Sequence, residues 1–242
     1  MFVFNQKIIQ MQTIQGDGFT VSVVKSSRRK TTALKIKNGE VTIHMPTRQS
    51  IAIARQFVEQ KTPWIQQKLQ HQAHQTLPEK QFITGEILLF LGKPYSLQLI
   101  SAERKTTVIK TAQTIELHGR LNSLSKTAIR TALLTWYKQQ AELYLRSQSA
   151  FLSSQTGLSP RSIAIKTYKA RWGSCRINGD IQYNWKLILA PPEIIDYVIT
   201  HELCHLKQHN HSAAFWQLVQ THCPQFKTAR LWLKNNGASL EI

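Results

Sequence analysis

The 242-residue chain has few cysteines, few acidic residues and no long apolar run. Its three cysteines, Cys175, Cys204 and Cys223, are an odd number, which excludes a framework that pairs all of them and is typical of a reducing compartment. The longest apolar runs, such as Ile87–Leu91, have the length of a strand, whereas a membrane span needs about 18 apolar residues. The N-terminus lacks the pattern of a secretion signal. We therefore expect a cytoplasmic globular protein that is not embedded in a membrane.

The shortage of acidic residues leaves the chain strongly basic. There are 31 Lys and Arg against 13 Asp and Glu, a formal net charge of +18. Such a balance is typical of proteins that bind phosphate backbones or anionic surfaces, so nucleic acid is a candidate partner. The charge is spread, with 17 basic and 7 acidic residues in 1–120 and 14 and 6 in 121–242. The one tight cluster, Lys25–Lys30, is either a phosphate contact or a solvated loop.

The first half, residues 1–120, is predicted to be a β-rich region with a helical insertion near residues 50–75. Asn38 and Gly39 supply the positive φ angles that a tight hairpin needs. Apolar residues at helical spacing predict a helix over residues 50–70, which Pro63 is expected to split in two. The sequence shows no internal repeat. Alternation predicts strands over 19–24, 34–37, 41–45, 87–91, 95–100, 107–111 and 114–118.

The second half, residues 121–242, is predicted to be a separate domain with its boundary near residue 120. A long helix is expected from Ser125 to about Ser154, with Gly157 and Pro160 after it. A further helix is expected to open at Pro192. Between them the sequence predicts strands over 163–167 and 181–184, a turn over 171–175, and an extension of the second strand over 187–190.

The helix that Pro192 opens contains His201-Glu202-Leu-Cys-His205, the pattern H-E-x-x-H. Residues four apart on a helix lie on one face about one turn apart, so His201 and His205 can bind the same ion. Glu202 lies beside them. It can take a proton from a water molecule that attacks a carbonyl group without binding the metal itself.

A third histidine follows at a metal-binding spacing. Five residues separate His205 from His211, as in extended H-E-x-x-H sites whose third ligand is histidine. His209 is the alternative, but a continuing helix would carry it along the axis and away from the ion. We therefore predict Zn²⁺ bound by His201, His205 and His211.

The extended site differs from that of a metzincin. Gln208 stands where a metzincin has glycine, and all three methionines precede the motif. We expect the chain to reverse between Lys207 and Asn210 by another route. Ser212 is then suited to cap the next helix.

The number of protein ligands separates two kinds of zinc site. Three histidines leave one position open for water, whereas a structural site closes with four protein ligands. Cys204 within the helix, or Cys175 or Cys223 through tertiary folding, could be the fourth ligand, and the sequence leaves this open. Three functions then stay open: a zinc peptidase that hydrolyses peptide bonds with this water, a basic nucleic-acid-binding protein with a structural zinc, and a zinc amidohydrolase of non-peptide substrates. An unliganded glutamate has no use in a structural site.

Three segments of the second half resemble the YgjP-like metallopeptidases, relatives of the SprT-like and WLM zinc proteases. They are residues 171–175, 184–192 and 196–216, and the specific match covers about residues 168–220. The resemblance implies an α+β protein in which a β-rich N-terminal part precedes a minimal zincin-type helical domain with a small sheet. It also implies a zinc-dependent endopeptidase that acts on proteins or peptides, with His201, His205 and His211 as ligands and Glu202 as catalytic acid and base. Some SprT-like and WLM relatives act on proteins attached to DNA, which again makes nucleic acid a candidate partner.

Groups that would assist the reaction are less evident from the sequence. Arg171 and Tyr183 lie in the resembling segments and could stabilise an oxyanion, but a packing or turn role fits each of them better. Asn184 is a candidate for fixing the tautomer of a zinc-binding histidine.

Overall fold

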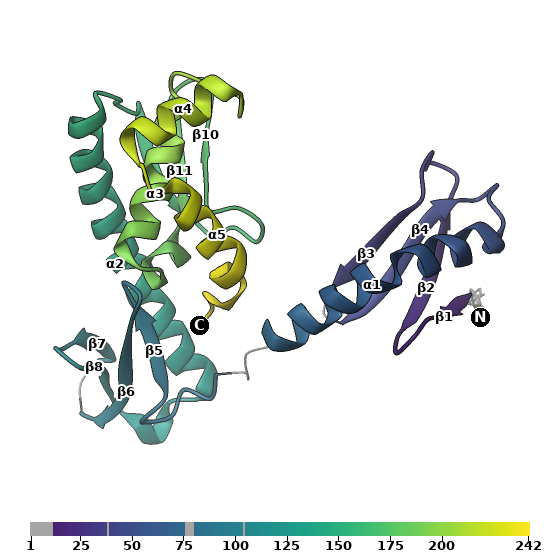
Figure 1. The fold of residues 1–242 in the computed structure, drawn as a ribbon. Helices are drawn as coiled ribbons and strands as arrows, with labels where there is room; N and C mark the ends of the chain where they lie inside the picture. Colours follow the sequence, from purple (N-terminus) through teal and green to yellow (C-terminus); the bar gives the residue numbers. More distant parts are fainter. Residues whose placement is uncertain (1–11, 38, 76–79, 104) are drawn as a thin grey trace, which may run out of the picture. The chain divides into compact units, whose positions relative to one another are not determined.

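The computed structural model describes residues 12–37, 39–75, 80–103 and 105–242. Within these residues it contains five α-helices and three small mixed sheets, which confirms the α+β class. The chain forms two compact units, Met1–Leu77 and Pro78–Ile242 (Figure 1). None of the described helices combines the length and the apolar character that a bilayer-spanning segment needs.

The first unit is a four-stranded sheet with the helix α1 packed on one face (Figure 1). The strand order is β1-β2-β4-β3, in which β2 runs parallel to β4 and the two outer pairs are antiparallel. The predicted alternation is confirmed, because alternate strand residues are buried against the helix. The elements are β1 (Thr13–Gln15), β2 (Thr20–Ser26), β3 (Ala33–Lys37), β4 (Glu40–Pro46) and α1 (Ile51–Gln75).

The predicted hairpin between the third and fourth strands is present. Lys37 pairs with Glu40 at its closed end, and Gly39 has a φ of 79°. Asn38, the other residue of the predicted turn, lies outside the described residues.

α1 continues through Pro63, where the sequence predicted a break. Proline has no amide hydrogen and removes one hydrogen bond from a helix. The helix nevertheless continues because Val58 and Ile65, which lie on either side of Pro63, are both buried against the sheet. The prediction of two helices was therefore wrong, since packing outweighs the local preference.

The second unit begins with a sheet that repeats the topology of the first. Its order is β5-β6-β8-β7, with β6 parallel to β8, antiparallel outer pairs and a long helix, α2, after the last strand. The sequence shows no internal repeat, but the strand arrangement of the first sheet occurs again in the second. The elements are β5 (Ile87–Phe90), β6 (Lys93–Ser101), β7 (Thr107–Lys110), β8 (Thr114–Gly119), the 3₁₀ turn η1 (Leu121–Ser123) and α2 (Lys126–Thr156).

The predicted ends of α2 are confirmed. The Ser125 hydroxyl accepts a hydrogen bond from the Ala128 amide at 3.2 Å, and Gly157 ends the helix with a φ of 69°.

The remaining chain forms a three-stranded sheet and three helices. The strand order is β10-β11-β9, with β10 antiparallel and β9 parallel to β11. Two local predictions were wrong: residues 173–175 form a strand instead of a turn, and residues 185–189 form a 3₁₀ helix instead of extending a strand. The elements are β9 (Ser162–Lys166), β10 (Gly173–Cys175), β11 (Asp180–Asn184), η2 (Trp185–Leu189), α3 (Pro192–Cys204), α4 (Ala213–His222), α5 (Phe226–Asn236) and η3 (Gly237–Ser239).

The sheet β5-β6-β8-β7 shares its core with the C-terminal helices. Buried residues of its strands and of α3 belong to one continuous apolar cluster. The turn between β5 and β6 is bonded to η2: the Leu91 amide donates to the Ile188 carbonyl at 2.7 Å, and the Gly92 amide donates to the Leu189 carbonyl at 3.2 Å. The boundary expected near residue 120 therefore falls inside the second unit, between β8 and α2.

Gly92 is the closest point of this contact, and we predict that a larger residue at this position destabilises the protein. Its φ is 73°, and a Cβ atom there would lie 2.7–2.9 Å from atoms of Pro191, the residue before α3. Gly92→Ala is expected to lower the free energy of unfolding by about 2–4 kcal/mol in urea titrations, because strain from positive φ adds to the steric overlap.

Gly157→Ala is the matched control. Its φ of 69° is nearly the same, but no atom lies within 4 Å of the added Cβ. We expect a loss of about 1–2 kcal/mol. Equal losses in both variants would contradict the contact with Pro191.

Candidate metal centre

α3 brings the predicted site residues to the surface of the second unit. Its apolar face is buried, and it contacts α2, α4, α5 and the strands β10 and β11 (Figure 1). The helix ends at Cys204, and the amides of Lys207 and Gln208 both donate to the Cys204 carbonyl, at 3.1 and 3.0 Å. The chain reverses at this turn, as predicted. The predicted cap is also confirmed, because the Ser212 hydroxyl accepts a hydrogen bond from the Phe215 amide at 3.4 Å at the start of α4.

This reversal brings the three predicted histidines together. His211 Nε2 lies 3.1 Å from His201 Nε2 and 3.2 Å from His205 Nε2. His209 is exposed and does not belong to this cluster. The alternative in which His209 takes the third position therefore finds no support in the geometry.

The hydrogen bonding of the rings leaves lone pairs directed at one point. The Gln208 carbonyl can only accept, so His205 Nδ1, at 2.8 Å, donates to it and Nε2 of the neutral ring carries a lone pair. A proton on His211 Nε2 could be donated to Nε2 of either His201 or His205, but not to both. A cation between the three nitrogens would satisfy all of them. Ligands at about 2.0–2.1 Å from a tetrahedral zinc ion are separated by about 3.3 Å, close to the observed spacing.

Aromatic rings from α4 hold the imidazoles in place. Phe215 stacks on His205 with ring centroids 4.4 Å apart, and Trp216 stacks on His211 at 5.6 Å. The Arg230 guanidinium, from α5, lies 4.9 Å from the centroid of Trp216. The sequence indicated the packing role of Phe215 and Trp216. It gave no sign of Arg230, because no local pattern relates residues that meet only through packing of α4 and α5.

The electrostatic surroundings favour neutral imidazoles. Burial, together with the nearby charges of His205, His211 and Arg230, lowers the pKa of His201 to about 3. Burial also lowers the pKa of His205, although its bond to Gln208 acts in the opposite direction. Neutral histidine is the form that binds a metal ion.

Glu202 is buried beside the cluster, with 6% of its surface exposed. It packs on the backbone of β10, where a Cβ atom at Gly173 would lie 2.6 Å from Glu202 Oε1 and 2.7 Å from Cγ. Burial raises the pKa of Glu202 to about 8, and the charge of Arg171 opposes this rise. Within the described residues, no hydrogen bond or ion pair occupies its carboxylate. The sequence predicted Glu202 but not its contact with Gly173, which is separated from it by 29 positions.

The cysteines do not join the histidines. Among the described residues, the only cluster with metal-binding geometry is His201, His205 and His211. Cys204 is fully buried, and burial raises the pKa of its thiol to about 12. Burial likewise raises the pKa of Cys175 to about 11. The fourth protein ligand that the sequence left open is therefore not provided by the described cysteines.

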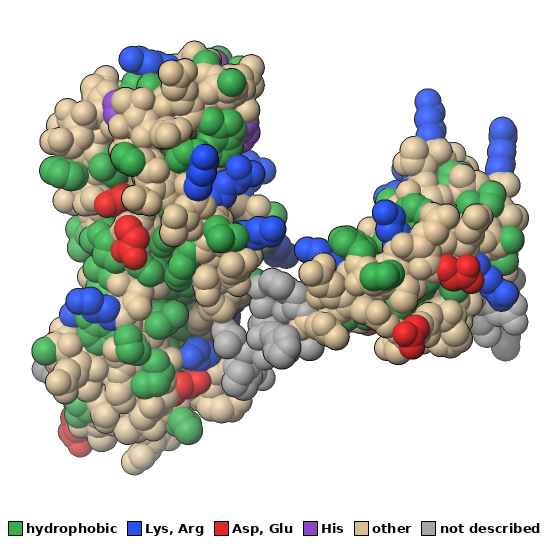
Figure 2. Space-filling view, viewed as in Figure 1, with side chains coloured by type: hydrophobic (Ala, Val, Ile, Leu, Met, Phe, Trp, Pro, Cys, Tyr) green, Lys and Arg blue, Asp and Glu red, His purple; other side chains and the backbone are tan. Residues whose placement is uncertain are grey.

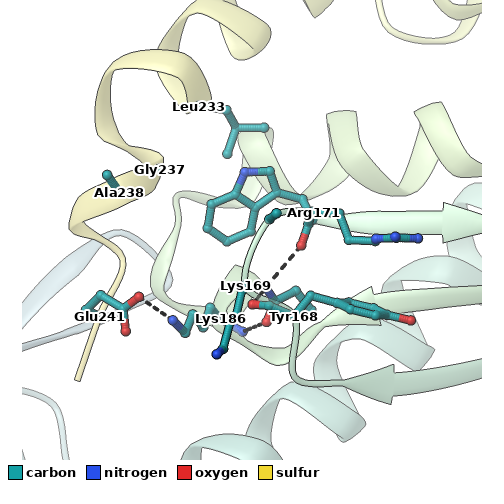
Figure 3. A pocket seen from close by; sticks show the side chains of 11 residues that line it. Tyr168, Lys169, Arg171, Lys186, Leu233, Gly237, Ala238 and Glu241 are labelled. Carbon is teal, nitrogen blue, oxygen red and sulfur yellow. Dashed lines mark hydrogen bonds and ion pairs between the residues drawn. The ribbon is translucent and has the colours of Figure 1, made fainter. Parts of the chain in front are cut away.

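Asn184 does not contact a histidine, so its predicted role was wrong. Its side-chain amide donates to the carbonyls of Tyr168 and Arg171, at 3.0 and 3.1 Å, and its oxygen accepts from the Lys186 amide. These bonds fix the loop that leads into β10, along a polar pocket of about 240 Å³ (Figure 3). The carbonyl that fixes a histidine tautomer comes instead from Gln208.

The two oxyanion candidates occupy different environments. Tyr183 is fully buried, and burial raises its pKa well above the usual range, which fits the packing role. Arg171 is exposed, with its guanidinium 5.3 Å from the centroid of the Tyr168 ring. The positive charge of Arg171 lowers the pKa of the Glu202 carboxyl, against the larger effect of burial.

Comparison with known proteins agrees with the geometry. The family model described as "YgjP-like, metallopeptidase domain" matches residues 30–236. No curated protein matches the chain. The crystal structure of the metallopeptidase zymogen of Pyrococcus abyssi abylysin is 20% identical, with a TM-score of 0.32, over 37% of this chain and 93% of that chain. That likeness is too distant to support a conclusion. Because the family model spans most of the chain, including β10, α3 and α4, the protein belongs to the YgjP-like family of metallopeptidase domains.

Proposed function

We propose that the protein is a zinc-dependent endopeptidase in which His201, His205 and His211 hold the ion and Glu202 is the general base. One observation carries the proposal. Nε2 of His211 lies within 3.2 Å of Nε2 of both His201 and His205, no fourth side chain of the described residues joins this cluster, and a buried carboxylate without a partner lies next to it. Three protein ligands are the pattern of a catalytic zinc site with an open position.

In the proposed reaction the ion would polarise the reactants, and residues of the chain hold the ligands in position. A zinc ion held by the three histidines would supply a Lewis acid that polarises a water molecule and a peptide carbonyl. The Gln208 carbonyl keeps the lone pair of His205 directed at the site. Phe215 and Trp216 prevent the rings from turning away, so the ligands are positioned before any ion binds.

Glu202 moves the proton in this proposal. It accepts a proton from the water whose oxygen attacks the carbonyl carbon, and it returns a proton to the amine as the C–N bond breaks. Burial raises its pKa to about 8 although the charge of Arg171 opposes the rise, and a nearby dication would further favour the ionised carboxylate. The contact with Gly173 fixes where the carboxylate lies.

The alternatives fit less well. A structural zinc in a nucleic-acid-binding protein would call for a fourth protein ligand, and it gives no reason to bury an unpaired glutamate beside the site. A zinc amidohydrolase of non-peptide substrates would use the same residues. The family match to metallopeptidases favours peptide bonds.

Glu202→Gln tests the proposed base. The variant keeps the size of the side chain but cannot accept a proton, so kcat for casein cleavage is expected to fall at least about 100-fold while one zinc per chain is retained. The measurement is metal content by mass spectrometry with initial rates on labelled casein. Equal activity in wild type and variant would remove the role given to Glu202.

His211→Ala tests the third ligand, with His209→Ala as its control. Loss of a ligand is expected to weaken zinc binding by more than the roughly 10- to 100-fold typical of an outer partner, in competition with a chelating dye. His209 is exposed and lies outside the cluster, so its removal should leave the affinity unchanged. Unchanged affinity in His211→Ala would refute the assignment.

Gly173→Ala tests the position of the base. The added methyl group would overlap Glu202, so we expect zinc to be retained and kcat to fall by roughly 100-fold, as for a displacement of about 1 Å. Ser174→Ala, one residue along β10, adds no atom toward Glu202 and should stay within about twofold of wild type. Full activity in Gly173→Ala would show that the contact with Glu202 does not matter.

A further inference from the structure

The first unit gathers five basic side chains at one end of its sheet. Four come from the end of β2 and the β2–β3 loop, and the fifth comes from the β4–α1 loop, 18 positions later. We call this cluster the basic end; it consists of Lys25, Arg28, Arg29, Lys30 and Arg48.

The topology explains why these segments meet. β2 and β4 run parallel and pair side by side, so both chains leave the sheet at the same edge. The Thr47 amide donates to the Ser26 carbonyl at 3.3 Å, and the Thr32 hydroxyl donates to Gln49 Oε1 at 2.5 Å. The two loops line a cavity of about 500 Å³ whose lining residues are Ser27, Arg29, Pro46, Thr47 and Arg48.

Acidic residues are absent from the two loops of the basic end. The segments 25–32 and 46–50 contain five basic residues and no acidic one. Asp17 lies in the β1–β2 turn and Glu40 is the first residue of β4, both at the opposite end of the sheet, and Glu59 lies within α1. All five basic residues are exposed, and none forms an ion pair within the described part of the chain. Figure 2 shows Lys and Arg side chains projecting from this unit. α1 also begins at this end, so its dipole adds to the positive potential.

The repeated topology provides an internal comparison. The corresponding loops of the second sheet, residues 102–106 and 120–125, contain three basic residues and the acidic Glu103. They line a cavity of about 480 Å³ in the same place. The fold therefore forms this cavity without requiring five unopposed cations, so the charge of the basic end calls for another explanation.

We propose that the basic end binds the phosphate backbone of duplex nucleic acid. Arginine matches phosphate with two parallel N–H donors, and serine and threonine hydroxyls are common phosphate contacts. The two loops contain no aromatic residue on which an unpaired base could stack, which favours a duplex over a single strand. They also contain no large apolar residue to enter a lipid surface. Binding should then be independent of sequence and strongly dependent on salt.

This surface is independent of the proposed peptidase chemistry, and its test needs no activity. The probe is a fluorescein-labelled 20-base-pair DNA duplex, titrated with the full-length protein by fluorescence anisotropy at several NaCl concentrations. The loop variant is Arg28→Gln/Arg29→Gln/Arg48→Gln. The control, Lys37→Gln/Lys61→Gln/Lys68→Gln, removes the same charge from exposed positions elsewhere in the unit.

The loop variant is expected to bind at least about tenfold more weakly at 100 mM NaCl, with the slope of log K against log salt reduced by roughly 2–3. The control should stay within about threefold of wild type. Circular dichroism melting checks the fold, and Arg48→Gln alone serves if the triple variant unfolds; it should lower the slope by about 1.

Three results would overturn the proposal. They are no binding of the duplex by wild type at 50 mM NaCl, an equal loss in the loop variant and the control, and tighter binding of phosphatidylserine vesicles than of DNA.

Discussion

The site depends on three imidazoles that converge, with His211 Nε2 at 3.1 Å from His201 Nε2 and at 3.2 Å from His205 Nε2. Three lone pairs in such a space repel unless a cation lies between them, so the arrangement is stable only as a binding site or at a cost to the fold. Each nearby element serves to maintain it. α3 supplies two of the rings, the turn bonded to the Cys204 carbonyl returns the third, and α4 packs Phe215 and Trp216 against them.

A second layer of structure holds α3 itself. The turn between β5 and β6 is bonded to η2 and fits against Pro191, the residue from which α3 starts. β10 approaches α3 so closely that only glycine fits opposite Glu202. The strands that precede α2 are therefore part of the support of the site, and the second unit cannot be divided near residue 120 without opening one continuous core.

The features that could be predicted from the sequence are those set by residues close together in the chain. The histidines and Glu202 lie within eleven positions, where helical geometry places His201, Glu202 and His205 and a known spacing indicates His211. The start of α2 at Ser125 and the cap at Ser212 are equally local. Contacts between distant segments could not be predicted in this way. They include Gly173 with Glu202, Arg230 with Trp216, and the packing that carries α1 through Pro63. The repeated sheet topology was also missed, because strand order is shared by segments whose residues are not alike.

In the proposed site three histidines bind the metal ion without sulfur and leave one position open. X-ray absorption at the zinc edge of the full-length protein measures these ligands. Three imidazole nitrogens and one further oxygen are expected at about 2.0–2.1 Å. A sulfur ligand at about 2.3 Å, or a fourth imidazole, would indicate a closed structural site and rule out the open position.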